Sequence, residues 1–252
     1  METFLSDGVE IAFIDEGDLD HDPIVLVHGF ASNHRVNWVE TGWVKALIDD
    51  GRRVIAIDNR GHGASAKLYR PEDYSSPMMA EDVRRLLDHL GIQAADVMGY
   101  SMGARITAFL ALNHGARVRS AIFGGLGIRM TTGFGDGEEI ARGLEEPSAE
   151  AVVGAGPKMF RKFAERTGSD LLALAACMRS TRAKIGPESL AKLSAPVLVA
   201  VGDDDEVGGL PGPLAALIPK GQPLLLKGRD HMTAVGTRQF KDGVLSFLSN
   251  LD

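Results

Sequence analysis

A serine lies between two glycines in the segment GYSMG, residues 99–103. An apolar run ends at Tyr100, and a helical pattern of small and apolar residues begins at Ser101. A serine nucleophile must stand exposed at the end of a strand, in a turn so tight that a Cβ two residues before or after it would clash. Gly99 and Gly103 meet that demand, so the pattern predicts that Ser101 is a nucleophile.

The predicted base is a histidine late in the chain. A serine hydroxyl needs a base to remove its proton, and imidazole is the usual base near neutral pH. On this kind of strand-to-helix turn the partners follow in the order serine, acid, histidine. Of the seven histidines, only His231 lies beyond the second half of the predicted sheet. It follows the last predicted strand, and we expect it at the start of the final helix, on the same rim as Ser101.

The acid that orients the histidine is expected between the two, at the end of a strand. The segment GDDDEV, residues 202–207, supplies four consecutive acids. Asp205 is preferred, because three residues past Gly202 the chain can turn out of the strand and face the imidazole. Asp203 is the second candidate and Glu206 the third.

Backbone N–H groups must stabilise the negative charge on the attacked carbonyl oxygen by hydrogen bonding, and each lowers the activation barrier by roughly 3 kcal/mol. The amide of Met102, directly after the nucleophile at a helix N-terminus, is one candidate donor. The other is the amide of Phe30, because the apolar run that ends in His28 and Gly29 lets the chain bend sharply there. His28 itself is predicted to be a buried, hydrogen-bonded structural residue.

A largely parallel sheet would position these residues. Short apolar runs alternate with helical patterns, which is typical of buried strands covered by helices on both faces. These runs are residues 23–29, 52–58, 95–100, 118–125, 195–202 and 222–228. A Ser-Asp-Gly turn between two alternating runs near the start predicts an antiparallel hairpin at one edge.

Residues 127–190 interrupt the alternation with several helical patterns and no convincing strand. This predicts a helical cap over the carboxyl ends of the strands, inserted into a core of residues 1–126 and 191–252. Apolar cap residues are expected to line a substrate pocket, with three further residues at its entrance, although they could instead only bury the cap helices against one another. Among the candidates are Phe134, Met159, Phe160, Phe163 and Met178 in the cap, and Asn33, His34 and Trp38 at the entrance.

Composition excludes several classes of protein. Hydrophobic residues make up 44% and charged residues 24%, as in an ordinary soluble globular chain. No apolar run approaches the roughly 20 residues that span a bilayer, and the start lacks the pattern of a secretory signal, so a cytoplasmic protein is expected. The 27 basic residues are scattered and outnumbered by 34 acidic ones, which argues against a nucleic-acid partner. The single cysteine, Cys177, lies in an apolar run and is expected to be buried.

Five segments, in this order, resemble the α/β-hydrolase fold superfamily: HGF at 28–30, DNRGHGAS at 58–65, GYSMG at 99–103, GDDDEV at 202–207 and the late His231. The resemblance covers essentially the whole chain. It implies an eight-stranded, mostly parallel sheet with helices on both faces and a helical cap after the sixth strand. Epoxide hydrolases and haloalkane dehalogenases of this superfamily use an aspartate nucleophile, so Ser101 argues against both.

The sequence therefore favours a serine hydrolase that cleaves a small to medium, fairly hydrophobic carboxylic ester through an acyl-enzyme intermediate. No zinc-like spacing, phosphate-binding loop or dinucleotide fingerprint is present, so neither a metal nor a cofactor is expected. The RGHG segment at 60–63 is commoner among esterases, lactonases and perhydrolases than among carbon–carbon bond hydrolases. Two alternatives remain open. One is a carbon–carbon bond hydrolase, lactonase or perhydrolase with the same triad, and the other is a non-catalytic or slow-turnover ligand receptor or signalling protein of the same fold.

Overall fold

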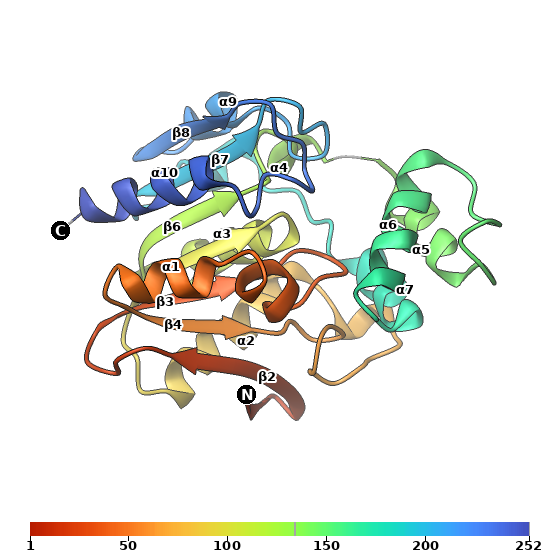
Figure 1. The fold of residues 1–252 in the computed structure, drawn as a ribbon, viewed down its shortest axis with the longest axis horizontal. Coiled ribbons are helices and arrows are strands. Elements are labelled where there is room, and N and C mark those ends of the chain that lie inside the picture. Colours follow the sequence, from red (N-terminus) through yellow and green to blue (C-terminus); the bar gives the residue numbers. More distant parts are fainter. Residues whose placement is uncertain (134, 252) are drawn as a thin grey trace.

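An eight-stranded sheet forms the centre of the computed structural model, which describes residues 1–133 and 135–251. Its strand order is β1-β2-β4-β3-β5-β6-β7-β8 (Figure 1). The strands are β1 (Glu2–Ser6), β2 (Val9–Glu16), β3 (Asp22–Val27), β4 (Arg52–Ile57), β5 (Ala95–Tyr100), β6 (Val118–Gly124), β7 (Val197–Gly202) and β8 (Gly221–Leu226). β2 pairs antiparallel with β1 and β4, whereas all the other neighbours are parallel. The predicted mostly parallel sheet and its edge hairpin are confirmed.

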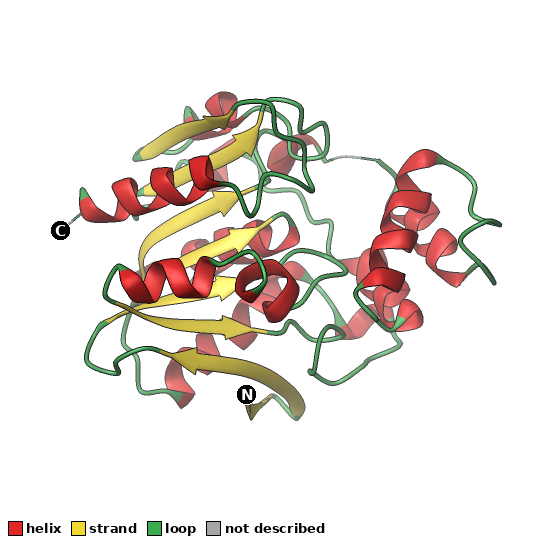
Figure 2. Cartoon of the chain, in the orientation of Figure 1, coloured by secondary structure: helices red, strands yellow, loops and turns green. Residues whose placement is uncertain are grey.

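Helices cover both faces of the sheet (Figure 2), so the central strands are buried on both sides. Side chains alternate along β3: Val25 and Val27 pack on one face, and Ile24 and Leu26 on the other. The helices over the first face are α2 (Ser76–His89), α3 (Met102–Asn113) and α9 (Pro211–Ala215), and those over the second are α1 (Trp43–Asp49) and α10 (Arg238–Ser249).

The α3 helix lies between the sheet and other helices, as its apolar sequence predicts. Nine of its twelve residues are buried, among them Ile106 and Leu110. A helix buried almost all round cannot rotate without exposing apolar surface. The residue at its start, Ser101, is therefore held in a fixed place at the carboxyl end of β5.

Only helices are found among the described residues between β6 and β7. They are α4 (Arg129–Thr132), α5 (Gly137–Glu145), α6 (Ala155–Arg166), α7 (Leu171–Ser180) and α8 (Pro187–Leu190). Figure 1 shows α5, α6 and α7 packed together beside the carboxyl ends of the strands. Several contacts hold α6 and the residues after it to the core. The Phe160 ring packs edge-on against Phe30 with centroids 5.8 Å apart, and the Thr167 hydroxyl donates to the Ala31 carbonyl at 2.9 Å.

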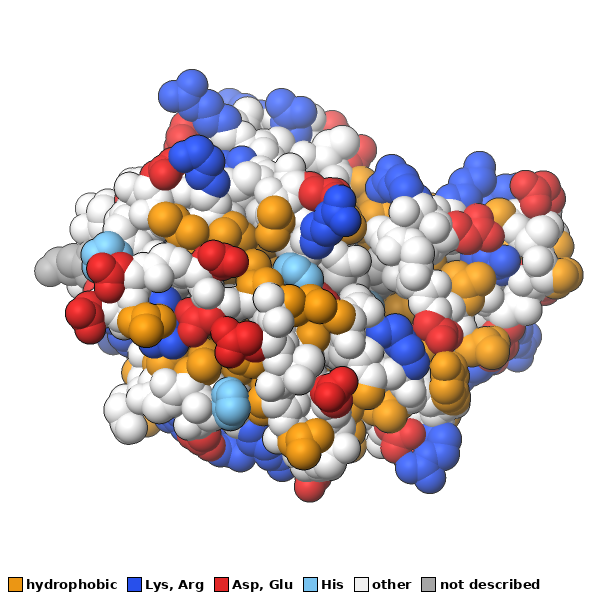
Figure 3. All heavy atoms as spheres, turned by 60° about the horizontal axis from the view of Figure 1, so that its bottom comes forward, with side chains coloured by type: hydrophobic (Ala, Val, Ile, Leu, Met, Phe, Trp, Pro, Cys, Tyr) orange, Lys and Arg blue, Asp and Glu red, His pale blue; other side chains and the backbone are white. Residues whose placement is uncertain are grey.

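Surface charges of both signs are interspersed on the face shown in Figure 3 rather than gathered by sign. None of the helices in the described part of the chain combines the length and hydrophobicity that crossing a bilayer requires.

Candidate active site

Ser101 occupies a strained turn between β5 and α3. Its φ of 54° and ψ of −111° are rare for a residue with a side chain. A Cβ on Gly99 would overlap the Gly103 carbonyl, and a Cβ on Gly103 would overlap the carbonyl oxygen of Val27 on β3. Both glycines are therefore required by close backbone packing. The amide of Ser101 donates to the Gly124 carbonyl at 2.7 Å, which ties the turn to β6.

Three polar side chains from distant parts of the chain form one hydrogen-bonded row. The Ser101 Oγ lies 3.0 Å from the Nε2 of His231. The Nδ1 of His231 lies 2.8 Å and 3.1 Å from the two carboxylate oxygens of Asp205. An ionised carboxylate can only accept hydrogen bonds, so Nδ1 carries the imidazole proton and Nε2 is left to accept from Ser101. Hydroxyl, imidazole and carboxylate thus follow one another in the same order as in the triad of serine hydrolases.

Asp205, rather than its neighbours, faces the imidazole. It is 4% exposed, and its Oδ1 also accepts from the Gly208 amide at 2.7 Å, which fixes the carboxylate. The Asp203 carboxylate instead accepts from the amides of Gly228 and Arg229, 2.6 Å and 3.3 Å away, in the loop after β8. Glu206 is exposed.

His231 lies in a turn-rich loop, seven residues before α10, so the expectation that it begins the final helix is wrong. The helix starts at Arg238, after Thr237, whose side chain accepts from the Phe240 amide at 3.3 Å as an N-terminal cap. The loop is held from two sides instead. The Tyr100 hydroxyl donates to the His231 carbonyl at 2.7 Å, and the Trp43 indole donates to the Val235 carbonyl at 2.6 Å.

The two predicted oxyanion donors line the same pocket as Ser101. Among the described residues, neither the Phe30 nor the Met102 amide N–H donates a hydrogen bond, so both are free to bind an oxygen. A Cβ on Gly29 would lie only 3.2 Å from the Tyr100 carbonyl oxygen, and 3.5 Å from the Cβ of Ser101. Glycine at this position thus allows the loop after β3 to approach Ser101 closely.

His28 is a buried structural residue, as predicted. Its Nδ1 donates to the Gly29 carbonyl at 2.7 Å, and its Nε2 accepts from the Asn59 amide at 3.0 Å. Burial lowers the pKa of His28, although the charge on Asp58 opposes this shift. His28 thus links the Phe30 loop to the loop after β4.

The RGHG loop after β4 is also held by buried polar contacts. The Arg60 guanidinium forms an ion pair with Asp82 of α2 at 2.7 Å, and both side chains are almost fully buried. His62 is buried too, and its burial together with the charge on His28 lowers its pKa to about 3. These contacts give the loop a structural role beside the site.

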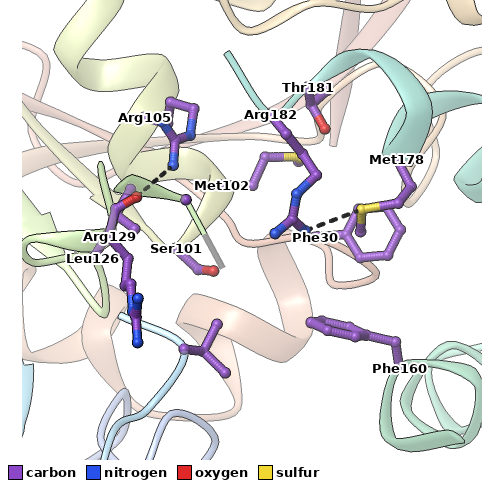
Figure 4. Close-up of a pocket in the computed structure, with 12 residues that line it drawn as sticks. Phe30, Ser101, Met102, Arg105, Leu126, Arg129, Phe160, Met178, Thr181 and Arg182 are labelled. Carbon is purple, nitrogen blue, oxygen red and sulfur yellow. Dashed lines mark hydrogen bonds between the residues drawn. The ribbon is translucent and has the colours of Figure 1, made fainter. Parts of the chain in front are cut away.

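Two pockets meet at Ser101. The first lies toward the cap and is lined by Phe30, Met102, Leu126, Phe160, Met178 and Val207, together with three arginines (Figure 4). The second is lined by Asn37, Tyr100, Phe160, Phe163, Arg166 and His231. The cavity volume is about 80 Å³ for the first pocket and about 220 Å³ for the second, so both suit small groups.

The predicted pocket residues divide into three groups. Met178 lines the first pocket and Phe163 the second. Met159 lines neither, because on α6 the next residue, Phe160, points between the two pockets. Phe134 lies outside the described residues.

The prediction that His34 and Trp38 edge the entrance is wrong. His34 is held away by Asp58, whose Oδ1 accepts from its amide at 2.7 Å and lies 2.9 Å from its Nδ1. Trp38 is fully buried, with its ring edge-on to Trp43 at a centroid distance of 6.3 Å. A short π-helix over Arg35–Val39 turns Trp38 into the core and leaves Asn37 facing the second pocket.

No pattern in the sequence points to several residues that the fold brings to the pockets. The Asn37 Nδ2 is buried without a hydrogen-bond partner among the described residues. Arg105 and Arg182 reach the first pocket from α3 and from the end of α7. No periodicity or motif distinguishes these residues, because only the approach of the cap to the core places them at Ser101. No group of three or more histidine, cysteine or acidic side chains arranged to hold a metal ion is found in the described part of the chain.

Comparisons with known proteins agree with the fold. The alpha/beta hydrolase fold family model matches residues 22–144. A non-heme chloroperoxidase of Kitasatospora aureofaciens is 36% identical over 117 residues, which cover 46% of this chain and 40% of that protein. The chain thus aligns with less than half the length of the curated relatives it matches first.

Solved structures match almost the whole chain, and two of them illustrate the likeness. A hydrolase from Pseudomonas aeruginosa is 26% identical with a TM-score of 0.74, over 98% of this chain and 97% of that one. An esterase from Exiguobacterium antarcticum superposes with a TM-score of 0.78 at 20% identity, over 96% and 97% of the two chains, and this likeness concerns the fold alone. With the strand order, the serine turn and the family match in agreement, the chain belongs to the α/β-hydrolase fold superfamily.

Proposed function

We propose that the protein is a serine hydrolase that cleaves carboxylic esters through an acyl-enzyme intermediate. The observation that carries the proposal is the row of hydrogen bonds from Ser101 through His231 to Asp205. In the proposed roles Ser101 is the nucleophile, His231 the general base and Asp205 the group that orients the imidazole and stabilises its cation.

The first half of the reaction transfers the acyl group to the serine. The Ser101 Oγ attacks the ester carbonyl carbon while His231 Nε2 takes its proton, and the amides of Phe30 and Met102 bind the resulting oxyanion. The carbon–oxygen bond to the alcohol then breaks, and the alkoxide leaves with the proton from His231. In the second half His231 removes a proton from water, the hydroxide attacks the acyl carbon, and Ser101 departs with that proton. The products are the acid and the free enzyme.

The positions of the two pockets suggest how a substrate lies. The leaving alcohol must receive its proton from His231, and His231 lines the second pocket but is not among the residues that line the first. The alcohol portion is therefore assigned to the second pocket, and the acyl portion to the first. Apolar side chains such as Leu126 and Met178 suit a fairly hydrophobic acyl chain of small to medium size. In this arrangement residues 127–190 serve as a cap over the acyl portion.

Turnover of p-nitrophenyl butyrate by the wild-type chain and by Ser101→Ala tests the function. We expect multiple turnovers by the wild type and a rate at least about 10³-fold lower for the variant, because loss of a nucleophile removes the covalent route. Ser249→Ala, an exposed serine at the end of α10, is the matched control and should leave the rate unchanged. A Ser101→Ala variant that retains the wild-type rate would refute the mechanism. A single slow burst from the wild type would favour a receptor of the same fold.

A further inference from the structure

Three arginines from separate segments line the acyl pocket, the first of the two pockets at Ser101. Arg105 comes from α3, Arg129 from α4, and Arg182 from the chain just after α7 (Figure 4). None of the described residues that line this pocket is acidic. The walls thus combine apolar side chains with positive charge, within reach of the nucleophile.

Arg105 lies deep in the wall, and none of the described residues places a carboxylate against it to balance its charge. It is only 8% exposed, and its guanidinium donates to the carbonyls of Met130 and Ala183 at 3.0 Å and 2.6 Å. Both carbonyls accept from Nη1, and neither carries a net charge. Burial and the nearby charge of Arg182 lower the pKa of Arg105 to about 10, so it stays protonated at neutral pH.

Arg182 is the more accessible of the two cations. Its Nη1 donates a hydrogen bond to the Met178 sulfur at 3.4 Å, and among the described residues no carboxylate lies within 4.0 Å of its guanidinium. Burial lowers the pKa of Arg182, and Asp136, which acts from a greater distance, only partly opposes this shift. In Figure 4 its guanidinium points into the space between Ser101 and Phe160.

Several other partly buried arginines have acidic partners. Arg179, one turn before Arg182, binds Glu138 and Glu145 at 2.9 Å and 2.6 Å, and Arg60 is paired with Asp82. A partly buried cation without such a partner costs free energy unless a ligand supplies the counter-charge. For Arg182 and Arg105, none of the described residues supplies this counter-charge, so a negatively charged ligand in the acyl pocket would do so.

We propose that the substrate is an ester whose acyl portion ends in a free carboxylate, a half-ester of a short dicarboxylic acid, and that Arg182 binds this carboxylate. The proposal rests on the proposed function, which assigns the acyl portion to this pocket. The planar guanidinium presents paired N–H donors that match the two oxygens of a carboxylate. Arg105 adds positive potential from behind, and Leu126 and Met178 contact the methylene groups between the two ends.

Specificity constants for monomethyl glutarate and dimethyl glutarate test the proposal, because the two esters share one acyl chain and differ by one charge. We expect the specificity constant of the wild type to be at least about tenfold higher for the half-ester, because one charge-assisted hydrogen-bonded pair contributes binding free energy of that size. Arg182→Gln should lower the ratio of the two constants at least tenfold, and Arg182→Lys should retain part of it. Arg238→Gln, at an exposed arginine that begins α10 and lines neither pocket, should leave the ratio unchanged. A wild-type preference for the diester, or a ratio that Arg182→Gln does not change, overturns the inference.

Binding to the inactive Ser101→Ala variant separates this inference from the proposed function. Isothermal titration with monomethyl glutarate should show binding at least tenfold tighter than with dimethyl glutarate, and Arg182→Gln in the same background should remove the difference. Thermal unfolding of each variant checks that it is folded. If the half-ester binds selectively but no ester is turned over by the wild type, the hydrolase function fails and the carboxylate site stands. If esters are hydrolysed but neither experiment shows selectivity, the carboxylate site fails alone.

Discussion

Replacing Asp205 by Asn should abolish most activity while leaving the fold intact. In the structure both Asp205 oxygens face the Nδ1 of His231, at 2.8 Å and 3.1 Å, and so hold the proton on that nitrogen. An asparagine amide has nearly the same shape but can present N–H donors to Nδ1. The imidazole would then carry its proton on Nε2, and that nitrogen could no longer accept from Ser101, 3.0 Å away.

The size of the effect follows from the tautomer. An imidazole in the wrong tautomer cannot remove the Ser101 proton, and its cation loses the adjacent negative charge. A triad acid changed to its amide lowers kcat by about 10⁴-fold in the serine proteases, which is about 5 kcal/mol of transition-state stabilisation. We expect a loss of about 10³- to 10⁴-fold in kcat for p-nitrophenyl butyrate, measured at saturating substrate between pH 7 and 8.

The matched control is Asp203→Asn, which makes the same chemical change two residues earlier. Asp203 is exposed and accepts from two backbone amides, and an asparagine carbonyl can still do so. This variant should retain most of the wild-type kcat. If Asp203→Asn abolishes activity and Asp205→Asn does not, the assignment of the acid is wrong.

Three further predictions concern stability and reactivity. Burial and the charge on His28 lower the pKa of His62 from 6.5 to about 3, so the stability that neutral His62 contributes should be complete above about pH 6.5 and decline by up to about 1.4 kcal/mol per pH unit as the pH falls toward 3. The free energy of unfolding in urea should therefore differ less between pH 7 and pH 5 in His62→Gln than in the wild type, and an equal difference in the two proteins contradicts this. Gly103→Ala should lower the free energy of unfolding by several kcal/mol, because the added Cβ would overlap the Val27 carbonyl. Gly156→Ala, where nothing lies within 4 Å of the added Cβ, should leave it unchanged or raise it by up to about 1 kcal/mol. Equal melting temperatures for the two variants would refute the packing argument. Burial raises the pKa of Cys177 to about 12, so its thiol should react with a thiol reagent only after unfolding, and rapid labelling of the native chain would contradict its burial.

The local parts of the site could be predicted because short-range sterics decide them. Gly99 and Gly103 flank Ser101 at a spacing that a strand-to-helix turn imposes, and the structure gives the backbone overlap that makes glycine necessary. The six parallel strands were predictable for a similar reason, since a strand buried on both faces must be apolar along its length. Their boundaries in the structure differ from the predicted ranges by no more than two residues at either end.

Other positions depended on contacts that a sequence does not display. Trp38 was expected at the pocket entrance, but one π-helical turn places Asn37 there and buries Trp38 against Trp43. His231 was expected at a helix start, but hydrogen bonds from Tyr100 and Trp43 hold it in a loop. These partners lie far away in sequence, so no local pattern records them.

The sequence by itself determined the fold class, the serine turn and the candidate acids for pairing with the imidazole, which are Asp203, Asp205 and Glu206. Only the tertiary structure decided that Asp205 is the acid that faces His231 and that Arg105 and Arg182 meet in the acyl pocket. The physical reason is the range of the interactions involved. Strand hydrophobicity and backbone crowding act between near neighbours in the chain, whereas a hydrogen bond or a shared pocket depends on which distant segments the packed core brings together.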